Sequence, residues 1–78
     1  MSLEQFIRDL EVTIEDVEPG SLGPETRYRE LAQWDSLAVL SVIAMVDAEY
    51  DCRLKAKTLK DCETIEALYR VVREGGGR

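Results

Sequence analysis

The sequence predicts an all-α fold, a small bundle of three main helices plus one short helix. Apolar residues recur with a helical period near both ends of the chain, and a nearly continuous apolar stretch lies between them. No segment shows the strict alternation typical of a β-strand. With 78 residues, 45% of them hydrophobic, the chain is a single domain close to the lower size limit for a core without staples. We expect the domain over residues 1–74 and a flexible tail over residues 75–78.

The first helix is predicted to begin at Ser2. Ser2 and Gln5 have the spacing of a capping box, in which each side chain bonds the backbone N–H of the other residue. An amphipathic period follows, formed by Leu3, Phe6, Ile7 and Leu10. The β-branched residues 12–14 do not favour a helix, so we expect it to fray or to continue weakly to Asp16.

A loop is predicted after this helix. Residues 18–25, EPGSLGPE, contain both prolines of the chain and two of its glycines. We expect the loop to run on to Trp34, with Tyr28 and Leu31 anchoring it to the core. Such long connections in compact domains are usually functional or disordered.

Asp35 is predicted to cap a second helix that runs to about Tyr50. After a break over residues 51–55, we expect a short helical turn over residues 58–61. Thr64 then has the position of a cap for the last helix. The helical period of that segment is formed by Ile65, Leu68, Tyr69 and Val72.

The second helix is apolar on more than one side, since nine of the ten residues over 37–46 are apolar. One stripe on the helical wheel consists of Val39, Val42, Ile43, Val46 and Tyr50. A second stripe consists of Leu37, Leu40, Ala44 and Ala48. A bundle of this size covers one stripe, so we expect the second to be partly exposed beside Ser36 and to serve in docking. The alternative is that the long loop folds over it.

The absence of histidine excludes Ser–His and Cys–His nucleophile pairs and the usual imidazole base. No Ser-x-x-Lys pattern is present, and the chain is too short to enclose a substrate pocket. We therefore expect no enzymatic activity, and a small hydrolase that used Ser36 would lack a base. Two cysteines, Cys52 and Cys62, are too few ligands for a zinc site. We expect both to be reduced thiols of a cytoplasmic protein.

The net charge of −6 argues against nucleic acid and favours protein partners with basic docking faces. The charge is uneven, with eight acids against three arginines over residues 1–31 and six basic residues against four acids over residues 55–78. No stretch approaches the roughly 18 apolar residues of a membrane helix, and no signal-peptide pattern is visible.

Ser36 lies at the start of the apolar helix, within QWDSLAVL (residues 33–40). One interpretation is a serine that only caps or begins the helix. A helix N-terminus, however, offers unpaired N–H groups and the positive end of the helix dipole, which favour a phosphate. A phosphate ester on Ser36 would therefore be stabilised there, although Asp35 would oppose it at close range.

The chain resembles the acyl carrier protein family over roughly residues 3–72. The resemblance rests on Trp34-Asp-Ser-Leu37 at a helix start, on the preceding loop with Tyr28 and Leu31, and on the ending TIEALYRVV. It implies a right-turning bundle in which Ser36 is esterified by 4′-phosphopantetheine, delivered from coenzyme A by a phosphopantetheinyl transferase. The thiol of this arm would carry an acyl group as a thioester.

The resemblance also implies partners and further site residues. Asp35 would help to position the modifying enzyme and its metal, and the carrier itself would be a monomer that binds no metal. The other partners would be enzymes that load and transfer acyl or amino-acyl groups through basic or apolar docking faces. The docking surface would consist of Leu37, Leu40, Ala44 and Asp47.

The sequence departs from carriers of fatty acid synthesis, which usually have a glycine two positions before the aspartate, where Gln33 stands here. Ala38 and Ser41 occupy positions that are commonly acidic. The third-helix region is basic through Lys55, Lys57 and Lys60. We therefore predict a carrier of a specialised pathway, such as a polyketide-type, polysaccharide-modifying or amino-acyl loading system. An amino-acyl or peptidyl carrier, and a helical interaction module without a cofactor, are the alternatives.

Overall fold

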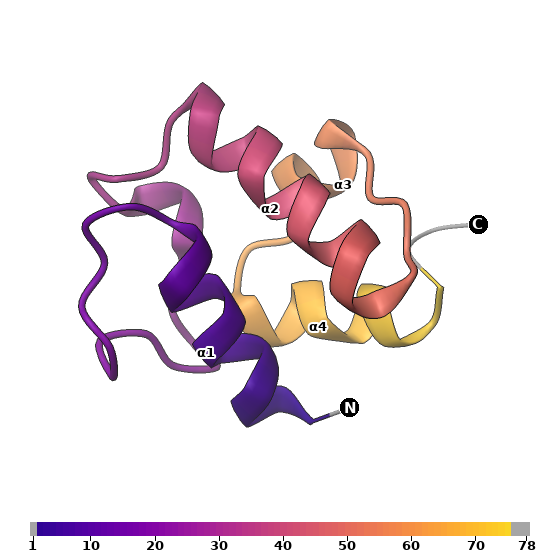
Figure 1. The fold of residues 1–78 in the computed structure, drawn as a ribbon, viewed down its shortest axis with the longest axis horizontal. Helices are drawn as coiled ribbons and strands as arrows, with labels where there is room; N and C mark the ends of the chain where they lie inside the picture. The colour runs from indigo at the N-terminus through magenta and orange to yellow at the C-terminus, as the bar shows by residue number, and fades with distance from the viewer. Residues whose placement is uncertain (1, 76–78) are drawn as a thin grey trace.

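The computed structural model describes residues 2–75, and the helices that follow one another along them are shown in Figure 1. They are α1 (Leu3–Thr13), the 3₁₀ helix η1 (Tyr28–Glu30), α2 (Ser36–Tyr50), α3 (Ala56–Asp61) and α4 (Ile65–Arg73). Residues 2–75 contain no strand, and the predicted all-α class is confirmed, with three main helices and one short one. Apart from Gly75, the tail expected over residues 75–78 lies outside the described residues.

Helix α1 begins as predicted but with only half of the capping box. The Ser2 hydroxyl oxygen accepts the Gln5 N–H at 3.2 Å, which satisfies one of the open donors of the first turn. The Gln5 side chain turns along the helix instead of back to Ser2, and it bonds Asp9 and Arg8. The helix ends at Thr13, so it does not continue to Asp16, which was one of the two expected outcomes. Ile14 instead takes an extended conformation and buries its side chain.

The long connection between α1 and α2 is fixed to the bundle by buried side chains. Leu22 and Tyr28 are both buried, and Leu31 is half-buried. The Tyr28 hydroxyl donates to the backbone oxygens of Leu59 (2.6 Å) and Cys62 (3.0 Å). The predicted anchors are thus confirmed, and the loop is an ordered part of the fold that includes the unpredicted η1.

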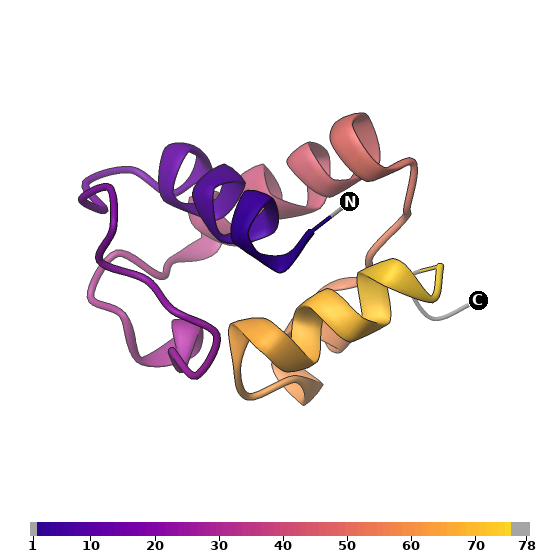
Figure 2. The ribbon, with the colours of Figure 1, turned by 90° about the horizontal axis from the view of Figure 1, so that it is seen from below.

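The helices pack with α2 against α1 and α3, and with α4 against α1. Figure 2 shows α1 and α2 together on one side of the molecule and α4 on the other. The loop also joins the start of α4, where the N–H groups of Ile65 and Glu66 bond the carbonyl oxygens of Thr26 (3.1 Å) and Pro24 (2.9 Å). The connection therefore follows α1 in the sequence and is also hydrogen-bonded to the start of α4. These contacts hold in place the residues that lead into α2.

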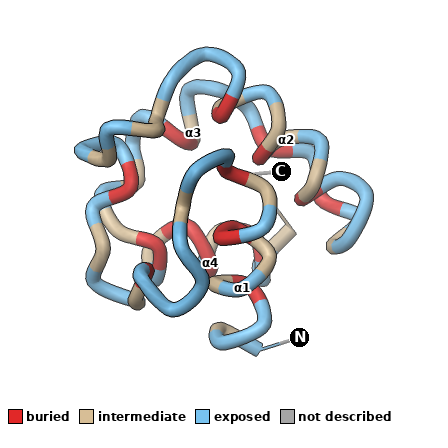
Figure 3. The backbone as a smooth tube through the Cα atoms, turned by 60° about the vertical axis from the view of Figure 1, so that its left-hand side comes forward, coloured by how far each residue is buried: buried red, intermediate tan, exposed pale blue. Residues whose placement is uncertain are grey.

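The core is largely aliphatic, as a chain with few aromatic residues requires. Figure 3 shows buried and exposed positions alternating along the helices, which is the burial pattern of an amphipathic bundle. Phe6 lies at the centre and contacts the rings of Tyr50 and Tyr69 at centroid distances of 5.6 and 5.5 Å. The largest fully buried side chains are those of Tyr28, Phe6, Leu10, Ile14, Leu59, Ile65, Leu68, Val42 and Val46.

The segment after α2 differs slightly from the prediction. Asp51 ends α2 in a left-handed conformation with φ of 50°, and α3 begins at Ala56 rather than at residue 58. Cys52 and Leu54 are buried in the break between the two helices, which pins the chain there. Thr64 caps α4 as predicted, since its hydroxyl oxygen accepts the Ala67 N–H at 3.1 Å.

Candidate functional site

The start of α2 places a capping carboxylate and an exposed hydroxyl side by side. Asp35 is the N-cap, with an extended backbone, and its Oδ1 accepts the Ala38 N–H at 2.8 Å. Ser36 is therefore the first helical residue and not the cap. Its side chain is exposed, and its hydroxyl forms no hydrogen bond with another residue of the described chain. A protein that approaches this end of the helix can reach the Ser36 oxygen directly.

The first turn of α2 retains donors for an anion on Ser36. The carboxylate and the carbonyl oxygen of Asp35 take the N–H groups of Ala38 and Val39. The N–H groups of Ser36 and Leu37 have no such partner among residues 2–75. Because open N–H groups at a helix start favour a phosphate, these residues fit a phosphodiester carried by the Ser36 oxygen.

The residues before Asp35 are held by the loop. The Trp34 ring packs against Tyr28 in an edge arrangement, with centroids 4.9 Å apart. The backbone N–H of Trp34 donates to the Leu31 carbonyl oxygen. Gln33 donates from Nε2 to the Asp16 oxygen at 3.1 Å. Burial raises the pKa of the Tyr28 hydroxyl, so this anchor is protonated at neutral pH. The tryptophan thus contributes to the site by fixing where α2 begins.

An apolar surface lies on α2 beside Ser36. Leu37 is 59% exposed and Leu40 is 64% exposed, and Ala44 and Asp47 are exposed further along the helix. The four residues that the sequence grouped as docking surface are therefore accessible on α2. The alternative, in which the long loop covers this stripe, is wrong because its residues remain exposed. Whether partners use this surface stays a prediction.

The opposite face of α2 belongs to the core. Val42 and Val46 have no exposed surface, and Ala38 is only 5% exposed. Ala38, which stands at a position that is commonly acidic in carriers of fatty acid synthesis, is therefore part of the core in this chain, where an unpaired charge would be costly. Ser41 is half-buried and lines a hollow that also includes Asp35, Glu15 and Asp16.

One residue that supports the site was missed by the sequence reasoning. Glu11 is 7% exposed, and its Oε2 accepts the N–H groups of Gly20 (2.9 Å) and Leu22 (3.1 Å). This carboxylate holds the loop against α1. The sequence did contain one indication of this role. Glu11 lies one helical turn after the apolar Ile7 and therefore on the same face of the helix, where a buried acid needs a hydrogen-bond partner.

The two cysteines form no disulfide in the described chain, as expected. Cys52 is buried, and Cys62 is half-buried at the end of α3. Burial, followed by the nearby charge of Asp61, raises the pKa of the Cys62 thiol. Since the thiolate is the reactive form, Cys62 is a weak nucleophile at neutral pH.

A comparison with known protein families matches residues 5–72 to the family described as phosphopantetheine attachment site, or PP-binding. The chain belongs to this family. The match spans the helical region from within α1 almost to the end of α4, and it includes Ser36. The comparisons with curated proteins and with solved structures gave no match.

Membership confirms the resemblance to acyl carrier proteins and implies a covalently attached 4′-phosphopantetheine. It favours the carrier over the alternative of an interaction module without a cofactor. Carrier domains of this family are not catalytic themselves, and they generally interact with a phosphopantetheinyl transferase and with biosynthetic enzymes. Within the part of the chain that the structure describes, no helix has the length and apolar character needed to cross a bilayer.

Proposed function

We propose that Ser36 is the attachment point of 4′-phosphopantetheine and that the chain is a discrete acyl carrier protein of a specialised pathway. The observation that carries this proposal is the exposed Ser36 hydroxyl at the first position of α2, with the cap supplied by Asp35. The other serines are less suited. Ser2 is itself a cap, the Ser21 hydroxyl donates to the Glu18 oxygen at 2.6 Å, and Ser41 is half-buried within α2.

The residues around Ser36 divide the remaining tasks. The open N–H groups of Ser36 and Leu37 would hold the phosphodiester, and the Asp35 carboxylate would help to position the transferase and its metal. The attached arm supplies a terminal thiol that carries the acyl cargo as a thioester. Leu37, Leu40, Ala44 and Asp47 would form the docking surface, and we propose that the carrier acts as a monomer in the cytoplasm.

The surface of the helices supports a specialised pathway over housekeeping fatty acid synthesis. The exposed face of α2 near Ser36 is apolar, and its carboxylates lie at the far end, at Asp47, Glu49 and Asp51. Carboxylates do lie beside Leu37, in the hollow that contains Asp35, Glu15 and Asp16. Along α2 from Ser36 to Val46, however, enzymes with strongly basic docking faces would find no complementary charge. An acyl chain processed efficiently by purified fatty acid elongation enzymes would contradict this part of the proposal.

Intact mass measurement tests the attachment site. The purified chain is incubated with coenzyme A, magnesium and a broad-specificity phosphopantetheinyl transferase. We expect the mass to increase by one phosphopantetheine group. The S36A variant should show no gain, and S41A, the matched control in the same helix, should be modified as wild type. A mass gain that persists in S36A, or no gain by the wild type, would contradict the proposal.

Thioester loading then distinguishes the cargo classes. The modified protein is offered acyl and amino-acyl donors together with their loading enzymes, and thioester formation is followed by mass. We expect acyl groups to be accepted. Exclusive loading with amino acids would instead assign the chain to the amino-acyl or peptidyl carriers and leave the role of Ser36 intact.

A further inference from the structure

Several cations lie on α3 and on the residues just before it. Residues 53–60 contain four basic residues and no acid: Arg53, Lys55, Lys57 and Lys60. All four side chains are exposed, and none forms an ion pair with another described residue. Leu59 is the residue of α3 that points into the core, with 1% of its surface exposed. The short helix therefore turns one side inward and presents cations to the solvent.

The stability of α3 accounts for Lys60, which stands in its last turn, but not for Lys55 and Lys57. Lys55 is the N-cap residue and supplies no side-chain hydrogen bond, whereas the other α-helices are capped by Ser2, Asp35 and Thr64. Lys57 stands in the first turn, where the positive end of the helix dipole disfavours a cation. A short helix with lysines at these positions is weaker than one with a cap and acids, so the lysines suit something outside the chain.

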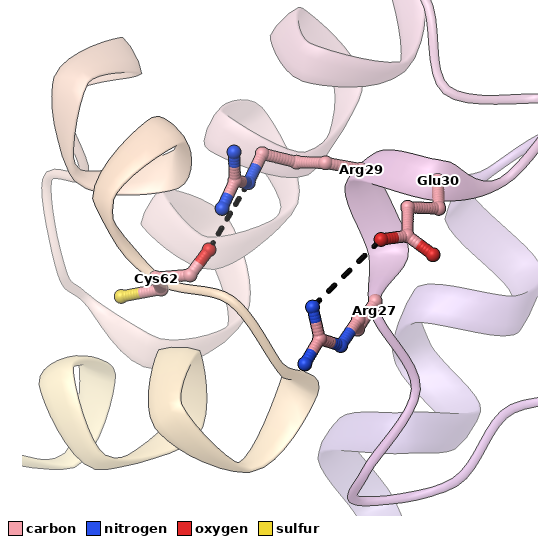
Figure 4. A network of polar contacts seen from close by, with 4 residues as sticks. All are labelled: Arg27, Arg29, Glu30 and Cys62. Atoms are coloured by element: carbon pink, nitrogen blue, oxygen red, sulfur yellow. Dashed lines mark hydrogen bonds and ion pairs between the residues drawn. The ribbon is translucent and has the colours of Figure 1, made fainter.

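A fifth cation comes from η1. The Arg29 Nε donates to the carbonyl oxygen of Cys62, the C-cap residue of α3, at 3.2 Å, as Figure 4 shows. This contact fixes the exposed arginine beside the C-terminal end of α3. Figure 4 also shows that Arg27 is engaged differently, since it pairs with Glu30 at 3.9 Å. We call the five residues Arg29, Arg53, Lys55, Lys57 and Lys60 the α3 basic surface.

The neighbouring helix has the opposite charge. Residues 32–52, which include α2, contain four acids and no lysine or arginine: Asp35, Asp47, Glu49 and Asp51. Because α2 packs against α3, the acidic and basic segments lie next to each other. Asp61 and Glu63 limit the basic segment at the C-terminal end of α3. The charge therefore changes sign between the two neighbouring helices, from negative on α2 to positive on α3.

We propose that the α3 basic surface docks an acidic surface patch of the enzymes that act on the arm, while α2 contacts an apolar or basic part of the same enzymes. This inference rests on the proposed carrier function for its biological meaning. Charge complementarity identifies the partner, since five exposed cations attract carboxylates. A nucleic acid or an anionic membrane fits less well than a local acidic patch, because such an extended anionic surface would also face the rest of the chain, which is more negative than the net charge of −6.

The test uses an oligoglutamate peptide as the probe and amide chemical shifts as the readout. At low ionic strength, we expect the peptide to shift the amides of residues 53–60 and Arg29, although the protein and the peptide are both acidic. High salt should abolish the shifts, because screening weakens interactions between exposed charges. An oligolysine peptide should instead perturb the amides around Asp47 and Glu49.

Two variants with equal changes in net charge locate the binding. K57E/K60E reverses two cations of α3, and R70E/R73E reverses two arginines with the same spacing on α4. We expect K57E/K60E to weaken oligoglutamate binding by about tenfold, from the loss of exposed charge pairs, and R70E/R73E to change it by no more than about twofold. Circular dichroism before and after heating confirms that both variants fold.

Several outcomes would overturn the inference: unshifted amides over residues 53–60, equal weakening by both variants, or tighter binding to phosphatidylglycerol vesicles, single-stranded DNA or inorganic phosphate than to oligoglutamate.

The titration is repeated on S36A, which cannot carry the arm. Loss of peptide binding with normal Ser36 modification contradicts the α3 basic surface alone. Failure of modification with normal peptide binding contradicts the carrier function alone.

Discussion

Two adjacent residues at the start of α2 have separate tasks. Asp35 bonds the Ala38 N–H and so begins the helix, which leaves the Ser36 hydroxyl exposed and without a structural partner in the described chain. If serine were the cap, its oxygen would be turned toward the helix and occupied. The order Asp-Ser, rather than the presence of a serine at a helix start, is therefore what makes position 36 suitable for modification.

Asparagine caps a helix about as well as aspartate, so capping and charge can be separated at position 35. We expect D35A to lose about 1 kcal/mol of unfolding free energy, and D35N to stay within about 0.5 kcal/mol of wild type. Urea denaturation measures both. If the carboxylate positions the transferase and its metal, D35N should also be modified at least about tenfold more slowly, as a loss of about 1.4 kcal/mol in the transition state requires.

The comparison of D35N with D35A decides between the two roles. A D35N protein that folds and is modified at the wild-type rate would show that Asp35 acts only as a cap. The caps at Ser2, Asp35 and Thr64 were predictable because each depends on residues three positions apart. The partners of Glu11 were not predictable, because Gly20 and Leu22 lie 9 and 11 residues away across a loop.

At the scale of elements, the connection over residues 14–35 determines how α2 enters the bundle. Its proline and glycine content predicted a loop, and the apolar Tyr28 and Leu31 predicted anchors. The short helix η1 and the early start of α3 were not predictable, because isolated turns depend on tertiary contacts such as the Tyr28 bonds to Leu59 and Cys62. The reciprocal capping-box bond failed because Asp9 and Arg8 compete for the Gln5 side chain.

The Glu11 carboxylate is the contact through which α1 holds this connection. We expect E11A to lose about 2 to 3 kcal/mol of unfolding free energy, because it leaves two loop N–H groups without a charged acceptor. E11Q should lose less, since its amide oxygen can still accept. Amide hydrogen exchange at Gly20 and Leu22 should accelerate in E11A. The control is E15A, which removes an exposed acid just after α1 and should remain within about 0.5 kcal/mol of wild type.

At the scale of the whole molecule, α2 belongs both to the core and to the docking surface. The sequence predicted two apolar stripes and predicted that the bundle covers one of them, which is confirmed by the exposed Leu37 and Leu40. It did not predict that Ala38 joins Val42 and Val46 on the buried face. Alanine is small enough either for an exposed position or for a tight contact between helices. Whether Ala38 faces the solvent or the core therefore follows only from how the other helices pack against α2.

The division of α2 predicts opposite effects for two neighbouring truncations. V42A removes methyl groups from a fully buried position, so we expect a loss of about 2 kcal/mol of unfolding free energy. Its modification at Ser36 should still reach completion. L40A truncates a side chain that is 64% exposed, so its stability should stay within about 0.5 kcal/mol of wild type. Its kcat/KM with the transferase should fall several-fold, because docking loses apolar contact area. If L40A destabilised the fold as much as V42A, Leu40 would be a structural residue of the bundle, and its effect on modification would say nothing about docking. If L40A kept its stability and was modified at the wild-type rate, Leu40 would be an ordinary surface residue and the apolar stripe beside Ser36 would have no part in recognition.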